Sequence, residues 1–133
     1  MKKRLKTLLL ISIAVIFGMA GMSAYAGSLD GKTFTGPTGI MGKEASEKDE
    51  VRFENGKFVS EGCKEWGFGH GSYLTSTEGK NTHFVADTYS DKEGRITWIG
   101  TISGSNADVT YLWYKKGAYA KPEQIKWFKG SMK

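Results

Sequence analysis

The stretch RITWIGTISGSNADVTYLWYKKG, residues 95–117, alternates large apolar side chains with small or polar ones on either side of a Gly-Ser-Asn segment. A period of two is typical of a half-buried β-strand, and glycine and asparagine favour the tight turns of β-hairpins. We therefore predict an antiparallel hairpin with strands over 95–103 and 107–115 and a turn at Ser105-Asn106.

In this register the inner face of the hairpin carries three cross-strand pairs: Trp98 with Trp113, Gly100 with Tyr111, and Ile102 with Val109. The outer face carries Ile99, Thr101, Leu112 and Tyr114. Gly100 has no side chain and would make room for the Tyr111 ring. The inner rings form either the wall of a ligand cavity or the filled core of a small barrel, in which eight strands leave just enough space for side chains.

The same strand-and-turn pattern continues from Leu29 to the end of the chain, without sustained helical periodicity. It predicts eight strands, over residues 31–36, 50–54, 57–62, 71–77, 82–90, 95–103, 107–115 and 124–132. Short connections favour antiparallel pairing of consecutive strands, and closure removes the exposed edges of such a meander. We expect an all-β fold, an eight-stranded antiparallel up-and-down barrel.

Two tight turns set the register early in the barrel. Asn55-Gly56 suits a type I′ turn, in which both central residues need positive φ, and places Phe53 opposite Phe58 and Glu54 opposite Lys57. Glu78-Gly79-Lys80-Asn81 reads as a second turn, which pairs Thr75 with Phe84 and Tyr73 with Ala86.

A three-residue loop, Lys92-Glu93-Gly94, is expected to join the next two strands. It would pair Thr88 with Trp98, Ala86 with Gly100, and Asp91 with Arg95. A four-residue loop would turn Asp87 inward instead, and we prefer the shorter loop because burying an unpartnered carboxylate is costly.

Two longer connections lie outside this pattern. Residues 37–49, PTGIMGKEASEKD, are expected to form a polar connection, and residues 62–71, GCKEWGFGHG, a glycine-rich bend that carries Trp66, Phe68 and His70. Each segment could border a barrel mouth. Alternatively, the first is only a solvated loop and the second only a hydrophobic plug.

The amino terminus has the three parts of a secretory signal peptide: a basic start at residues 2–6, an apolar run at 8–20, and Ala24-Tyr25-Ala26 as the cleavage site. We expect residues 1–26 to be removed and residues 27–133 to form a single β-barrel domain in the periplasm or outside the cell. The apolar run is shorter than the roughly 20 residues of a spanning helix, so no stable membrane anchor is expected.

The leader carries four of the 19 Lys and Arg residues and none of the 14 Asp and Glu residues, which leaves a net charge of +1 for residues 27–133. Nucleic-acid binding depends on a clustered excess of cations, so no nucleic-acid partner is expected.

Catalytic, metal and cofactor signatures are not recognisable. Cys63, His70 and His83 are the only soft metal ligands, and their spacing matches no zinc pattern. Cys63 is expected to be a buried thiol rather than a reactive or intermolecularly paired one. We therefore expect a binding protein with no enzymatic activity, no metal and no cofactor.

The strand layout resembles the calycin group of lipocalin-like and avidin-like barrels. GKTFTG at 31–36 looks like their first strand, with Phe34 in place of the usual tryptophan, and TWIGTISGSNADVTYLW at 97–113 is similar to the avidin-type hairpin. The resemblance implies a small hydrophobic or aromatic ligand inside the barrel. Carried over by position, the cavity would be lined by Tyr73, Phe84, Thr88, Trp98, Tyr111 and Trp113. The polar ring of biotin binders is not recognisable.

A second resemblance favours an alternative function. YLWYKKGAYA at 111–120 looks like the late strand of small exported barrels that inhibit lysozyme, which would bind an exported protein partner through their rim loops. Those proteins usually carry a cysteine pair and a Ser-Gly-x-x-Tyr loop. Here Ser103-Gly104 is not followed by a tyrosine at that position.

Overall fold

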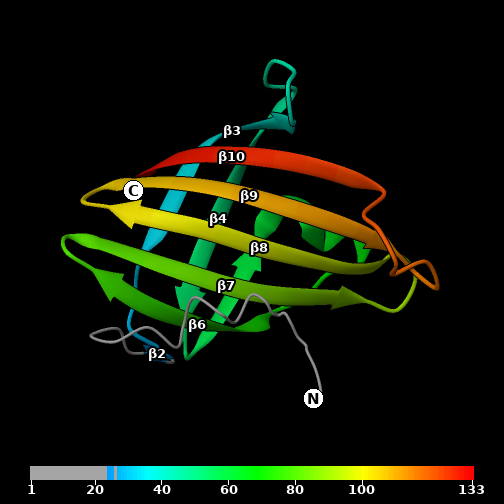
Figure 1. The fold of residues 1–133 in the computed structure, drawn as a ribbon. Helices are drawn as coiled ribbons and strands as arrows, with labels where there is room; N and C mark the ends of the chain where they lie inside the picture. The colour runs from blue at the N-terminus through cyan, green and yellow to red at the C-terminus, as the bar shows by residue number, and fades with distance from the viewer. Residues whose placement is uncertain (1–23, 26) are drawn as a thin grey trace.

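The computed structural model describes residues 24–25 and 27–133, and it is an all-β barrel (Figure 1). Eight strands follow one another in a meander, as predicted. They are β3 (Thr33–Ile40), β4 (Glu47–Glu54), β5 (Lys57–Ser60), β6 (Gly71–Glu78), β7 (Asn81–Ser90), β8 (Gly94–Ser103), β9 (Asn106–Lys115) and β10 (Gln124–Met132). A two-residue strand, β2 (Ala24–Tyr25), and a 3-10 helix, η2 (Glu61–Trp66), complete the described elements.

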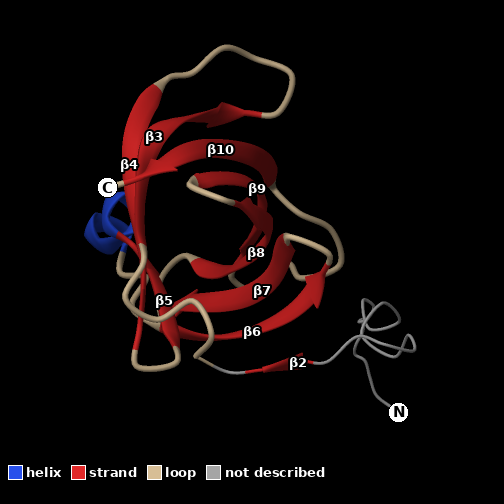
Figure 2. Ribbon diagram, turned by 90° about the vertical axis from the view of Figure 1, so that its left-hand side faces the viewer, coloured by secondary structure: helices blue, strands red, loops and turns tan. Residues whose placement is uncertain are grey.

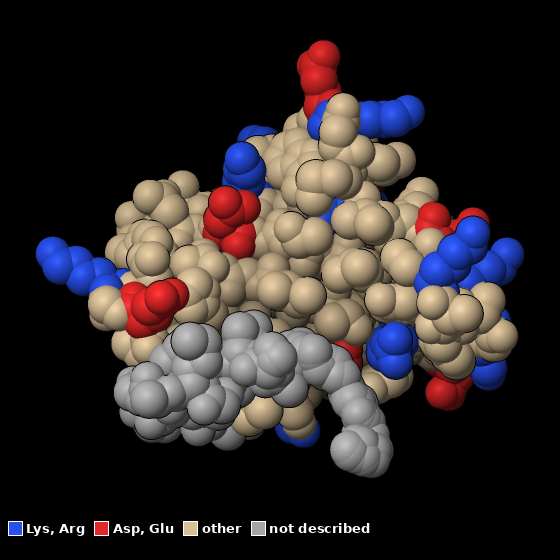
Figure 3. Space-filling view, in the orientation of Figure 1, with Lys and Arg blue, Asp and Glu red and all other residues tan. Residues whose placement is uncertain are grey.

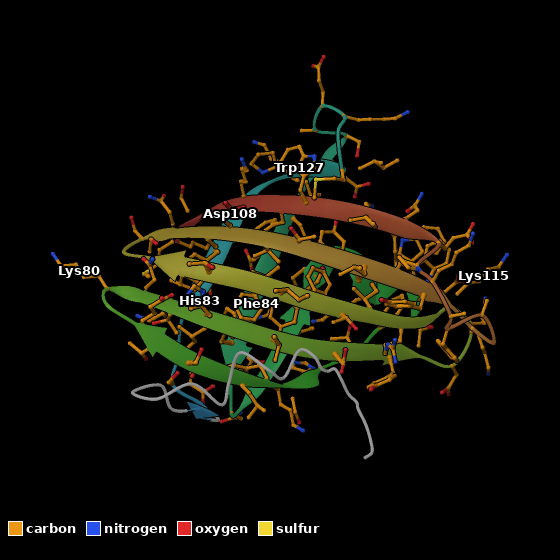
Figure 4. The ribbon with its side chains drawn as sticks, viewed as in Figure 1. Lys80, His83, Phe84, Asp108, Lys115 and Trp127 are labelled. Carbon is orange, nitrogen blue, oxygen red and sulfur yellow. The ribbon has the colours of Figure 1, made fainter. Side chains whose placement is uncertain are left out.

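The strands close into a ring because β10 pairs with β3 and β6 pairs with β7, every pair being antiparallel (Figure 2). This topology is compatible with the calycin resemblance. The connections 41–46, 61–70, 91–93 and 116–123 lie at one end of the barrel, here called the open end; the opposite end is called the closed end. Lys115 and Lys80 mark the open and closed ends, respectively, in Figure 4.

The weakest seam of the ring lies between β5 and β6, which share only two register pairs, Lys57 with Ser72 and Phe58 with Gly71. Beyond this point β2 pairs with β6 through Ala24 and Ser76. Apart from these two residues of β2, the predicted leader lies outside the described residues, and its removal stays a prediction. Among the described residues, no helix is both long enough and apolar enough to cross a membrane.

Two of the predicted hairpin registers are confirmed. Asn55 and Gly56 adopt φ angles of 53° and 75°, and Glu54 pairs with Lys57. The register predicted for β6 and β7 is also confirmed, because Tyr73 pairs with Ala86.

The two later registers are each wrong by two residues. In the β7–β8 hairpin Ala86 pairs with Trp98, because the connection is 91–93 and Gly94, at φ 111°, already belongs to β8. In the β8–β9 hairpin the turn is Gly104-Ser105, so Trp98 pairs with Tyr111. A shift by two keeps every side chain on its predicted face.

The space beside Gly100 is filled by other residues than expected. A Cβ atom at Gly100 would lie 2.5 Å from Phe84 Cε1 and 2.9 Å from Val109 Cγ2. Gly100 therefore makes room for the Phe84 ring, which belongs to the buried core cluster, and not for Tyr111.

The half of the barrel nearer the closed end is filled with aromatic side chains. The Phe53 ring lies at its centre and meets four other rings at centroid distances of 4.9–6.3 Å, namely those of Phe34, Phe58, Tyr73 and Phe84. These rings are almost fully buried, so this half is a packed core.

The segment 27–32 seals the closed end. Leu29 is 3% exposed and belongs to the core cluster. Its backbone N–H donates to the Tyr73 hydroxyl over 2.9 Å, and that hydroxyl donates to Asp30 Oδ1 over 2.8 Å. The segment 27–32 therefore covers the closed end of the barrel.

Acidic and basic side chains are interspersed on the face shown in Figure 3, mostly toward its margins. No single sign of charge dominates this face.

Candidate functional site: a pocket at the open end of the barrel

The open half of the barrel contains a pocket of about 280 Å³. Its wall comes from β3, β4, β8, β9, β10, η2 and the loops beside them. The lining residues are Thr38, Glu47, Asp49, Gly62, Cys63, Trp66, Phe68, Glu93, Ile96, Tyr111, Trp113, Gln124 and Lys126. The barrel interior is thus filled at one end and hollow at the other.

The prediction of a long polar connection over 37–49 is wrong. Residues at both ends of this segment belong to strands, and three of them, Thr38, Glu47 and Asp49, line the pocket. β3 continues to Ile40 and β4 begins at Glu47, so only residues 41–46 form a loop. The inward alternation of Val51 and Phe53 then extends back to Asp49 and Glu47. Polar side chains can occupy these inward positions because they line the pocket, where other side chains do not fill the interior.

The glycine-rich bend over residues 62–71 borders the mouth of the pocket, which is one of the two roles considered for it from the sequence. Its first part is η2, and Gly67 ends that helix at φ 90°, where its N–H donates to the carbonyl of Lys64. Phe68 is buried in the core cluster, whereas Trp66 is 57% exposed at the rim of the pocket.

Tyr111 links the packed core to the pocket. Its ring stacks on that of Trp98, and its hydroxyl hydrogen-bonds to Thr38 Oγ1 at 2.5 Å. Thr38 Oγ1 in turn donates to the carbonyl of Trp127 over 2.7 Å, so the Tyr111 hydroxyl acts as the donor to Thr38. Burial raises the pKa of Tyr111 well above its ordinary value, and the phenol stays neutral.

Asp49 places a half-buried carboxylate in the pocket wall. Its Oδ1 accepts from the backbone N–H groups of Glu50 (2.7 Å) and Gly62 (2.8 Å), and its Oδ2 accepts from the Ser60 hydroxyl (2.5 Å). Burial nevertheless raises the pKa of Asp49, because desolvation outweighs these three donors. A carboxylate offers about four acceptor positions, so one is left for a ligand.

Cys63 is partly exposed, packs against the core and lines the pocket. Burial raises the pKa of its thiol to about 11. The thiolate is the nucleophile and the metal ligand, and at neutral pH the thiol is protonated. This geometry suits a packing role.

Trp113 and Lys126 form the mouth from adjacent strands. The Trp113 indole N–H donates to the carbonyl of Glu93 over 2.8 Å, which fixes the ring against the β7–β8 loop. Lys126 pairs in register with Tyr111, and its ammonium lies 5.7 Å from the centroid of that ring. A cation over an aromatic face is attracted by the ring quadrupole.

The six residues expected to line a cavity divide between core and pocket. Tyr111 and Trp113 line the pocket, whereas Tyr73, Phe84, Thr88 and Trp98 are buried and do not line it. Thr88 accepts a hydrogen bond from the Trp98 indole over 3.0 Å. Whether Tyr111 or Trp113 contacts a ligand stays a prediction.

Neither histidine reaches the pocket. His70 bonds to Glu54 over 3.1 Å, and His83 bonds to Thr101 and Glu78. Within residues 24–25 and 27–133, no group of three or more His, Cys, Asp or Glu side chains is arranged to hold a metal ion. The pocket therefore offers charge, hydrogen bonds and aromatic surface to a ligand.

Sequence reasoning missed the polar residues of the lining: Thr38, Glu47, Asp49, Glu93, Gln124 and Lys126. A usable signal was present in the strand period. Counting back in steps of two from Phe53 reaches Asp49 and Glu47, and counting back from Phe128 reaches Lys126 and Gln124. Comparison of the chain with protein-family models, with curated proteins and with solved structures gave no match.

Proposed function

We propose that the protein is a non-enzymatic binding protein that holds a small aromatic ligand in the pocket at the open end. The pocket itself carries this proposal: about 280 Å³ of space bounded by four aromatic side chains, those of Trp66, Phe68, Tyr111 and Trp113. Pockets for small molecules commonly measure about 300–1,000 Å³ and have apolar walls with a few polar groups. The volume suits a molecule with one ring and a short chain.

The experiment titrates the ¹⁵N-labelled protein with one-ring aromatic compounds of each charge and follows the four indole N–H signals. The proposal predicts a saturable shift of the Trp113 signal, assigned with Trp113→Phe. Trp113 is the right reporter because its N–H is anchored at the mouth by the Glu93 carbonyl.

Alternation along β10 supplies a matched pair of variants. Gln124 lines the pocket, whereas Ile125 lies on the outside and is 41% exposed. Gln124→Trp should fill the pocket and abolish the shift, and Ile125→Trp should leave it intact. A shift that survives Gln124→Trp, or no shift with any compound, refutes the proposal.

Protein binding through the rim is the second candidate, favoured by two exposed rings in the loops at the open end: Trp66 at 57% and Tyr119 at 48%. An interface of this kind would act like the lysozyme-inhibitor barrels that the 111–120 segment resembles. A lysozyme inhibition assay with the purified protein tests it. Inhibition lost in Trp66→Ala and Tyr119→Ala, with no response to small ligands, would favour the rim over the pocket.

Export to the periplasm or the medium is part of the proposed function. It is supported by the basic start, the short apolar run and the Ala24-Tyr25-Ala26 sequence. Mass spectrometry of protein recovered from cells should give an amino terminus at Gly27 or within a few residues of it. Recovery of the full chain with the membrane fraction refutes export.

A further inference from the structure

We infer that the pocket selects a cationic ligand, an aromatic amine or ammonium compound, over neutral and anionic compounds of the same shape. The inference rests on the proposed function and adds the charge of the ligand. Its basis is the combination of an aromatic wall with carboxylates that have no cation of their own.

Three acidic residues line the pocket, Glu47, Asp49 and Glu93, against one basic residue, Lys126. None of the three makes a salt bridge with any residue in the described part of the chain. Other glutamates of the barrel are paired: Glu50 with Lys133, for example, and Glu61 with Lys64. The negative charge at the open end is therefore left without an internal partner.

Asp49 would make the direct contact. Three donors hold its carboxylate in place, so little side-chain entropy of Asp49 is lost when a ligand binds. One acceptor position of the carboxylate remains for the ligand. Its raised pKa shows that these donors do not fully replace the lost water. An ammonium N–H would form a charge-assisted hydrogen bond at this position.

Lys126 shows that the pocket accommodates an ammonium group. The side chain points inward from β10, and its Nζ lies over the Tyr111 ring although it forms no salt bridge with the pocket carboxylates. A ligand cation would use the same aromatic face and would compete with Lys126 for it. Removing the lysine should therefore strengthen cation binding, which is the opposite of the result for an anion site.

The test compares three matched compounds at neutral pH: 2-phenylethylamine as cation, 3-phenylpropanamide as neutral compound and 3-phenylpropanoate as anion. Calorimetry gives the affinities, and the Trp113 indole signal places each compound. We expect the amine to bind about tenfold more tightly than the amide, as one added charge-assisted contact allows, and the anion to bind most weakly.

Variants of the carboxylates test the source of the preference. Asp49→Asn keeps the side-chain volume and the acceptor for the Gly62 N–H, and it should reduce amine affinity about tenfold while the amide binds as before. Glu47 is exposed and forms no salt bridge with another described residue, so we expect Glu47→Gln, the second variant, to leave the fold intact. Asp108→Asn, on the outer face, is the control.

Lys126→Gln should raise amine affinity, with Lys129→Gln outside the barrel as its control. The outcomes separate the two proposals. If the amide or the carboxylate binds as tightly as the amine and still shifts Trp113, the inference fails and the proposed function stands. If none of the three shifts Trp113, both fail. Amine binding that Asp49→Asn and Glu47→Gln leave unchanged also overturns the inference.

Discussion

The ring of Trp98 stacks on the ring of Tyr111, with 4.2 Å between the centroids and 18° between the planes. The two rings belong to different environments. Trp98 is fully buried and touches the packed half through Phe58, whereas Tyr111 lines the pocket. The stack is therefore the boundary between the filled and hollow halves of the barrel, and the two halves can be tested separately.

Trp98→Ala should destabilise the barrel by about 3–5 kcal/mol, because it removes a fully buried ring from a close-packed core. Urea denaturation followed by circular dichroism measures the loss. Trp66→Ala is the control, since that ring is mostly exposed, and it should change stability by less than about 0.5 kcal/mol. Equal losses in the two variants would contradict the division into a core and a rim.

Gly100→Ala should destabilise the protein by about 1–3 kcal/mol through overpacking. The added Cβ would lie 2.5 Å from a ring carbon of Phe84 and 2.9 Å from a methyl group of Val109, both buried. Neither neighbour is the flexible end of an exposed side chain, so backbone or ring must move. The same denaturation experiment measures the effect.

Gly69→Ala provides the comparison for Gly100. Nothing lies within 4 Å of a Cβ built at Gly69, and its φ is not in the left-handed region. We expect it to be neutral or to stabilise by up to about 1 kcal/mol through the unfolded state. If Gly100→Ala behaves like Gly69→Ala, the close approach of Phe84 to strand β8 is not a constraint on the fold.

Alkylation of Cys63 should be slow at neutral pH and should accelerate up to about pH 11, the raised pKa of its thiol. Only the thiolate reacts, and at pH 8 the rate should be about 100-fold below that of an exposed cysteine with a pKa of about 8.5. Iodoacetamide labelling followed by mass spectrometry gives the rates, with the urea-unfolded protein as reference. Comparable rates in folded and unfolded protein would show that the thiol is not shielded.

The strand order and the inner faces of the strands follow from the sequence, but two registers do not. A hairpin shifted by two residues buries the same side chains, so periodicity cannot distinguish Trp98 opposite Trp113 from Trp98 opposite Tyr111. The difference lies in the turn. Gly104 adopts a φ of 60° and starts the β8–β9 turn one residue before the predicted position. Glycine, serine and asparagine all favour turns, so local preferences do not decide which two of the residues 104–106 form this turn.

The pocket was harder to predict than the strand order, because several of its inward-facing residues are polar, whereas inward-facing residues of a strand are usually apolar. Polar residues such as Glu47 and Asp49 indicate a loop when hydrophobicity alone is considered. In this barrel they are the inward positions of β4, placed where the interior is not filled. Two of the six expected positions, Tyr111 and Trp113, lie in the pocket because aromatic side chains border both its floor and its mouth.

The pH dependence of stability should reveal the desolvated carboxylate of Asp49. Burial raises its pKa above the ordinary aspartate value of 3.8, so the folded protein binds this proton more tightly than the unfolded chain. The resulting contribution to stability is present below about pH 3.8 and is lost as pH rises through the folded pKa. Glu50 and Glu61 have lowered pKa values and act in the opposite direction.

Asp49→Asn isolates this effect, since the Glu50 and Glu61 contributions are common to both proteins and cancel in the difference. Relative to the variant, the wild-type protein should lose stability as the pH rises above about 3.8 and through the raised pKa of Asp49, because only the wild-type side chain must become a buried anion. Urea midpoints at several pH values measure the difference, and Asp108→Asn corrects for the lost surface charge. A saturating aromatic amine should reverse the trend by supplying the cation that the carboxylate lacks, whereas a difference independent of pH would mean that Asp49 is as well solvated in the barrel as in the unfolded chain.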